Sequence, residues 1–141
     1  MVHSDGDIAG ALMTIDPRSD IDMLVGVGGT PEAVVTACAL KGTGAQMLTR
    51  LKPKTEEERE AIIKDGFDLK AIRSIDELVT TDQCFFSATG VTPGELLDGV
   101  HYKGGFALTS SMCSRGRTGT VRYIEAWHDR KKLSKMSTIE Y

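Results

Sequence analysis

The distribution of apolar and polar positions predicts alternating helices and strands over about the first 90 residues. Polar clusters followed at once by apolar runs indicate helices over residues 8–13 and 33–41. Residues 21–27 form a short, mostly apolar run, and this run and residues 45–51 are predicted strands. Pro31 suits the first turn of the second helix, and the glycines that follow it suit its end.

Two further helices are indicated, the first of them by its start signal. Thr55 followed by Glu58 is a capping-box pattern, which opens a charged helix that runs to Lys64 and ends at Asp65-Gly66. The acidic first turn of this helix complements the partial positive charge of a helix N-terminus. Residues 74–78 predict another short helix.

Strands dominate the last part of the chain. Residues 84–88, 106–111 and 120–127 are predicted strands, and glycines 99, 104 and 105 indicate a hairpin. Thr92 is expected to begin a helical turn. Taken together, the elements predict an α/β domain with a central mixed sheet flanked by helices.

Length and composition narrow the class of protein. A chain of 141 residues fits one domain, and 40% hydrophobic with 26% charged residues is typical of a soluble globular protein. No apolar run approaches the roughly 20 residues that cross a bilayer, and the N-terminus lacks a secretory signal pattern. A net charge of −3 argues against a dedicated nucleic-acid partner. We expect a cytoplasmic protein without a membrane partner.

Cys38, Cys84 and Cys113 match neither a zinc pattern nor a CxxC motif. An odd number of cysteines without a signal peptide indicates reduced thiols, and the apolar neighbourhood of each predicts a packing role.

The most informative stretch for chemistry is residues 26–32, where a predicted strand leads through glycines into a helix start. A glycine turn at a helix N-terminus can bind an anion, most often phosphate. The alternative is a tight turn without a ligand. Glu32 in the first helical turn either offsets the helix dipole or, beside a phosphate, acts as a metal ligand, because hard cations take carboxylate and phosphate oxygens together.

Other polar clusters carry weaker signals. Asp5, Gly6 and Asp7 either cap the helix from Ile8 or accept hydrogen bonds from sugar hydroxyls. Residues 87–92 follow a strand, where α/β sheets place ligands, but simple turn chemistry also explains them. The three histidines form no ligand spacing, and Arg115-Gly116-Arg117 fits either a solvated turn or a phosphate contact.

These clusters occur in one order along the chain: Asp5-Gly6-Asp7, Ile21-Asp22-Met23-Leu24, Gly28-Gly29-Thr30-Pro31-Glu32, Phe86-Ser87-Ala88-Thr89-Gly90-Val91-Thr92, residues 94–100 and residues 118–126. In that order they resemble the C-terminal portion of class II fructose-1,6-bisphosphatases of the GlpX type, from about Ser4 to His128. Residues 1–128 would then be the C-terminal α/β portion of a sugar bisphosphatase and residues 129–141 a polar tail.

The resemblance implies a layered sugar-phosphatase fold, similar to that of the inositol phosphatases. It also implies hydrolysis of the 1-phosphate of fructose 1,6-bisphosphate in gluconeogenesis, with Mn²⁺ or Mg²⁺ as cofactor. Carried over by motif, Asp5, Gly6, Asp7 and Gly29 bind the substrate and Glu32 binds a metal ion. The partners implied are a small sugar bisphosphate and, in a homo-oligomer, further copies of the enzyme.

Two departures from the family pattern matter. The family loop reads Gly-Gly-Ala-Pro-Glu-Gly, whereas this chain has Thr30 and Ala33 at the third and last positions. Family members are also about twice as long, and their N-terminal part carries the other metal-binding carboxylates and the residues that activate water. No catalytic residue is therefore assigned in this chain, which we expect to be inactive alone. A non-catalytic sugar-phosphate or nucleotide binding module, and a fragment that cannot fold alone, remain as alternatives.

Overall fold

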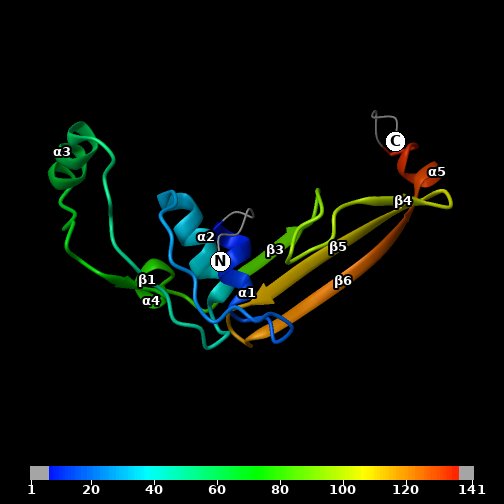
Figure 1. The fold of residues 1–141 in the computed structure, drawn as a ribbon, viewed down its shortest axis with the longest axis horizontal. Coiled ribbons are helices and arrows are strands. Elements are labelled where there is room, and N and C mark those ends of the chain that lie inside the picture. Colours follow the sequence, from blue (N-terminus) through cyan, green and yellow to red (C-terminus); the bar gives the residue numbers. More distant parts are fainter. Residues whose placement is uncertain (1–6, 137–141) are drawn as a thin grey trace.

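The structure is a computed structural model that describes residues 7–136. Helices α1 (Asp7–Met13) and α2 (Thr30–Leu40) pack against each other and lie beside the main sheet (Figure 1). No helix in the described part is long and apolar enough to cross a membrane.

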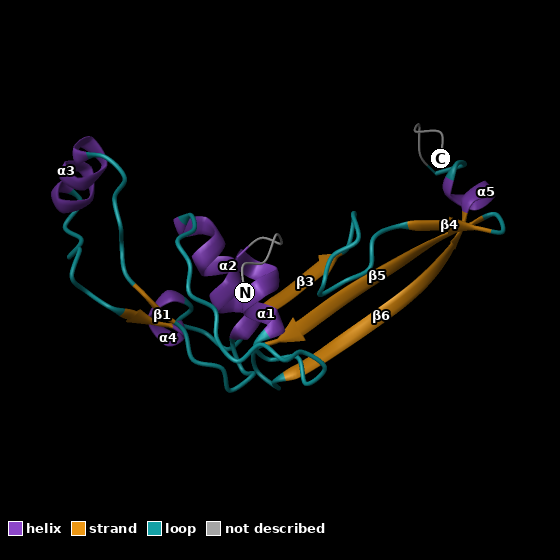
Figure 2. Ribbon diagram, in the orientation of Figure 1, coloured by secondary structure: helices purple, strands orange, loops and turns teal. Residues whose placement is uncertain are grey.

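The main sheet is built around β5 (Phe106–Arg115). Strand β6 (Thr120–Asp129) pairs with β5 along its whole length, from Phe106 opposite Asp129 to Arg115 opposite Thr120. On the other side, β3 (Phe85–Thr89) and β4 (His101–Lys103) pair with opposite ends of β5. Figure 2 shows β5 and β6 as a long twisted ribbon that extends well beyond the two helices.

The prediction of a mixed sheet is wrong for the described part of the chain, because every strand pair there is antiparallel. Parallel pairs need crossover connections between strands. The predicted strands that could have supplied them do not join this sheet. Residues 45–51 contain only the two-residue strand β1 (Leu48–Thr49), which pairs with β2 (Arg73–Ser74) in a separate small sheet.

The helices predicted from Thr55 to Lys64 and over residues 74–78 are confirmed. Helix α3 (Glu56–Lys64) starts at Thr55, whose side-chain oxygen accepts a hydrogen bond from the Glu58 N–H at 3.2 Å. It ends before Gly66, which has a φ of 83° that favours glycine. Helix α4 (Ile75–Leu78) follows Ser74 with a complete capping box. Figure 1 shows α3 at the end of an arm, far from the main sheet, and α3 buries no residue.

The hydrophobic core lies between the two N-terminal helices and the facing side of the main sheet. Its two largest fully buried side chains are Leu12 from α1 and Met112 from β5. Helix α2 contributes Ala37, Ala39 and Leu40, which all lie toward its C-terminal end. The small alanines allow the helix to approach the sheet closely.

Two sequence predictions differ from the structure. Residues 21–27 form no strand: residues 22–27 are exposed and their backbone groups bond to no other described residue, and the Ile21 N–H donates to the Ser19 hydroxyl at 3.2 Å. The turn predicted from Thr92 is not helical. Residues 92 and 93 pack closely against Gly99, where a Cβ would overlap Pro93. At the other end of the chain, β6 continues through Asp129, which caps α5 (Arg130–Leu133) by accepting a hydrogen bond from the Lys131 N–H at 2.9 Å.

Candidate functional site

The glycine turn and Glu32 lie at the exposed N-terminus of α2. Gly29 is the N-cap residue, with φ −73° and ψ 157°, and its carbonyl accepts a hydrogen bond from the Ala33 N–H at 3.1 Å. Glycine offers no side chain to cap the first-turn amides, and Pro31 lies in that turn as predicted. The helix therefore presents uncapped N–H groups and its positive dipole end at the surface.

The Glu32 carboxylate folds back over Gly29. A Cβ placed on Gly29 would overlap Glu32 Oε2 and would lie 3.1 Å from the Glu32 Cδ atom. Within residues 7–136, the Glu32 carboxylate has no hydrogen-bond or salt-bridge partner. An exposed carboxylate thus lies against the backbone of the glycine turn.

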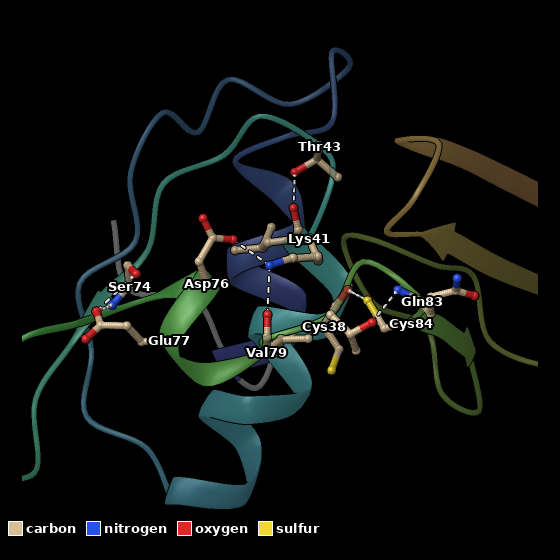
Figure 3. Close-up of polar contacts among 11 residues, drawn as sticks. Cys38, Lys41, Thr43, Ser74, Asp76, Glu77, Val79, Gln83 and Cys84 are labelled. Carbon is tan, nitrogen blue, oxygen red and sulfur yellow. Dashed lines mark hydrogen bonds and ion pairs between the residues drawn. The ribbon is translucent and has the colours of Figure 1, made fainter.

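The other end of α2 is held firmly. The Lys41 ammonium group donates hydrogen bonds to Asp76 Oδ1 at 2.5 Å and to the Val79 carbonyl at 2.7 Å (Figure 3). The buried Ser114 hydroxyl of β5 donates to the Ala39 carbonyl at 2.9 Å. Polar contacts to α4 and β5 thus fix the C-terminal end of α2, while its N-terminal turn stays accessible.

Glycine contacts tighten the same end of α2. Gly42 has φ +86°, and a Cβ there would overlap the Gly116 carbonyl of the β5–β6 turn. A Cβ on Gly119, in the same turn, would overlap the Gly42 carbonyl. Arg115-Gly116-Arg117 therefore belongs to a packed turn, and the Arg115 guanidinium lies 5.4 Å from the centre of the Phe85 ring.

The remaining members of the sequence-predicted site are only partly placed. Asp5 and Gly6 lie outside the described residues, and Asp7 is the first residue of α1. The structure therefore does not test whether the Asp5-Gly6-Asp7 motif faces the turn at Gly29. The packing of α1 against α2 does place the two elements that carry these motifs side by side.

The polar residues of 87–92 are used within the sheet. Thr89 Oγ1 lies 2.8 Å from Ser111 Oγ, and Ser87 Oγ lies 3.3 Å from Cys113 Sγ. Gly90 donates its N–H to the Ser110 carbonyl at 3.0 Å. These contacts join β3 to β5, so Ser87, Thr89 and Gly90 serve strand pairing rather than the simple turn chemistry considered from the sequence.

All three cysteines are free and half-buried. Cys84 Sγ lies 3.9 Å from the Cys38 carbonyl oxygen, between α2 and β3 (Figure 3). Burial raises the pKa of the Cys38 thiol, and the neighbouring Cys84 adds to this effect. The packing role predicted for Cys38 and Cys84 is consistent with these surroundings.

The sequence analysis missed a polar cluster at the loop after α1. The Asp16 carboxylate is buried and forms a bidentate pair with Arg18, with Nε–Oδ1 2.8 Å and Nη2–Oδ2 2.6 Å. The Tyr123 hydroxyl of β6 donates to Asp16 Oδ2 at 2.7 Å, and the Arg18 guanidinium lies 4.1 Å from the centre of its ring. The hydrogen bonds from Arg18 hold the pKa of Asp16 well below its usual range.

This cluster borders an open hollow of about 880 Å³ between the loop, residues 94–98 and β6. Burial and the hydrogen bond to Asp16 raise the pKa of Tyr123. Because the charges of Asp16 and Arg18 compensate each other, the cluster joins the loop to the sheet and provides no unpaired charge for a ligand. The composition of Asp16-Pro17-Arg18 is typical of a turn, but no sequence pattern links these residues to Tyr123.

The structure is that of an α/β protein in which a helix begins at a glycine turn without a side-chain cap and a carboxylate lies against that turn. The family model described as "Bacterial fructose-1,6-bisphosphatase, glpX-encoded" matches residues 1–128, and the chain belongs to this family. The resemblance seen in the sequence is thereby confirmed, and the family acts on a sugar bisphosphate.

Curated relatives agree with this assignment. The chain is 34% identical to the class 2 fructose-1,6-bisphosphatase of Haemophilus influenzae over 148 residues, which cover 96% of the chain and 44% of that enzyme. It is 34% identical to fructose-1,6-bisphosphatase 1 class 2 of Escherichia coli K12 over 142 residues, covering 90% of the chain and 42% of that enzyme. The chain thus spans less than half the length of these relatives, as expected for a C-terminal portion.

Proposed function

We propose that this chain is the substrate-binding C-terminal part of a class 2 fructose-1,6-bisphosphatase. The complete enzyme would hydrolyse the 1-phosphate of fructose 1,6-bisphosphate and release fructose 6-phosphate and inorganic phosphate, a step of gluconeogenesis. The observation that carries the proposal is the exposed turn at Gly29, with the Glu32 carboxylate against it, in a chain that matches the family over residues 1–128.

Each motif has a physical role in this proposal. The uncapped amides of the α2 N-terminus would receive phosphate oxygens, and Gly29 would allow the substrate to approach the backbone closely. Asp5 and Asp7, on either side of Gly6, would accept hydrogen bonds from sugar hydroxyls. The proposed enzyme has the layered arrangement of sugar phosphatases, works in the cytoplasm and assembles as a homo-oligomer.

The cofactor proposed is Mn²⁺ or Mg²⁺. Residues 1–141 would supply only part of the set of ligands that holds it. Residues 7–136 contain no group of three or more His, Cys, Asp or Glu side chains that could hold a metal ion. Glu32 would supply one carboxylate oxygen ligand, which suits a hard cation. The other ligands would come from the part of the longer relatives that residues 1–141 do not cover, so we expect no phosphate release by residues 1–141 alone.

The test joins this chain to the N-terminal part of the Haemophilus influenzae relative and measures phosphate release from fructose 1,6-bisphosphate with Mn²⁺. Glu32→Gln keeps the size of the side chain but removes its charge, so we expect activity to fall at least about a hundredfold and the Mn²⁺ requirement to rise. Glu60→Gln, on the exposed surface of α3, is the matched control and should leave both unchanged. Unchanged activity of Glu32→Gln would refute the metal role.

A second candidate function is ligand binding without hydrolysis. It is favoured by the lack of a metal-holding group within the described residues, combined with an exposed helix N-terminus. Isothermal titration calorimetry of the chain alone, with fructose 1,6-bisphosphate and with a nucleotide, would distinguish the ligands. Heat with the sugar bisphosphate would support a binding module, and no heat with either would dismiss it.

A further inference from the structure

The segment that leads into the candidate site has the composition of a strand but pairs with no neighbouring strand. Residues 22–28 are exposed throughout, and none of their backbone N–H or C=O groups bonds to another described residue. Met23, Val25 and Val27 expose 76%, 82% and 62% of their surface. An extended run of exposed apolar residues with free backbone groups is a template for pairing with another strand.

The two faces of this segment differ in what covers them. A Cβ placed on Gly10 of α1 would lie 3.2 Å from the Leu24 side chain, so Leu24 packs against α1. The alternate residues Met23, Val25 and Val27 project from the opposite face, as the two-residue period of an extended chain requires. Leu24 is the one large apolar residue on its face, beside Asp22 and Gly26, whereas the opposite face is wholly apolar and exposed, which is typical of a strand face that another layer covers.

The surface continues past the segment. Val34 and Val35, in the first half of α2, are also exposed, whereas the second half of this helix is buried. Exposed apolar residues therefore lie on both sides of the turn at Gly29 and Glu32 along the chain. We define residues 21–27 together with Val34 and Val35 as the docking surface.

We propose that residues 21–27 form a strand when the N-terminal part of the same enzyme adds strands beside them, and that this pairing holds the turn at Gly29 in place. This inference rests on the proposed function. The N-terminal part is the favoured occupant because more than half the length of the relatives lies outside this chain, since it covers 44% and 42% of them.

A second copy of this chain fits the docking surface less well. In a two-fold contact residues 21–27 would pair with themselves, which satisfies one edge of the segment. The second edge and the face formed by Met23, Val25 and Val27 would still be exposed. A larger partner that contributes neighbouring strands and a covering layer can satisfy all three at once.

Hydrogen exchange tests the proposal in the isolated chain and in the chain joined to the N-terminal part of the Haemophilus influenzae relative. We expect the amides of residues 22–27 to exchange at least roughly a hundredfold more slowly in the joined protein, because they become hydrogen-bonded. Met23→Asp should reduce this protection at least about tenfold, since it places a charge on a buried face. Val25→Asp should act in the same way.

Met136→Asp is the matched control, because Met136 is 79% exposed and lies outside the family match at residues 1–128. We expect it to change the protection by less than about twofold. In the isolated chain, both methionine variants should melt at the same temperature as the parent.

The outcomes separate this proposal from the proposed function. Protection of residues 22–27 without phosphate release would support the pairing and refute the bisphosphatase assignment. Phosphate release while these amides stay unprotected would overturn the pairing alone. Protection that appears in the isolated chain and grows with its concentration would identify a second copy as the occupant, which also overturns the proposal.

Discussion

Tyr123→Phe removes a single hydrogen bond from the cluster that joins the loop after α1 to β6. The variant deletes the hydroxyl that donates to Asp16 at 2.7 Å but keeps the ring beneath the Arg18 guanidinium. A hydrogen bond to a charged acceptor contributes about 1.5–3 kcal/mol. Tyr123 is 41% exposed, so we expect a loss near the lower limit, about 1.5 kcal/mol.

Thermal unfolding followed by circular dichroism measures this loss. For a chain of 141 residues, a change of about 1.5 kcal/mol lowers Tm by roughly 5 °C. Tyr102→Phe is the matched control. Tyr102 also has an arginine over its ring, with Arg130 at 5.1 Å, but its hydroxyl bonds to no described residue.

The pH dependence of this loss in folding stability is a second measurement. The hydrogen bonds from Arg18 and Tyr123 lower the pKa of Asp16 in the folded protein. A lowered carboxyl pKa stabilises the fold fully above the unfolded value, near 3.9, and this contribution is lost as the pH falls below it. The unfolded state is common to both proteins, so the difference between parent and Tyr123→Phe should stay constant from pH 7 to about 4 and narrow only at lower pH, where the Asp16 carboxylate, still paired with Arg18, becomes protonated in the folded variant. Equal losses for Tyr123→Phe and Tyr102→Phe would refute the reasoning.

Two further predictions concern the packing that positions α2. Gly42→Ala should cost clearly more stability than Gly44→Ala. Both glycines have φ above +80°, but only Gly42 lies against the Gly116 carbonyl. Equal shifts of the two variants in denaturant midpoint would argue against close packing at Gly42. Met112→Ala should cost about 2–5 kcal/mol by urea unfolding, since Met112 is fully buried in the core. A cost below about 1 kcal/mol would place Met112 outside the packed core.

Local signals predicted the elements whose causes are local. Thr55 caps α3 through the Glu58 N–H, and Gly66 follows its end with the positive φ that only glycine adopts easily. The glycines at 104 and 105 form the turn between β4 and β5. The helix start at Pro31, which carries the candidate site, could be predicted for the same reason.

Predictions failed where an element depends on distant partners. Residues 21–27 have the composition of a strand, but a strand needs a neighbour for its backbone groups, and the described chain provides none. The sheet was expected to be mixed, but its pairs are antiparallel because the strands that could give parallel pairs stay outside it.

The sequence by itself determined the family, because ordered motifs such as the turn at Gly29 and Glu32 are local; the substrate and metal roles of these residues stay predictions. Only the tertiary structure decided how α2 is held, through the Lys41 and Ser114 contacts to segments 35 to 75 residues away. It also joined Asp16 to Tyr123 across 107 residues. Such contacts depend on chain folding that brings distant residues together, and no short sequence pattern encodes that distance.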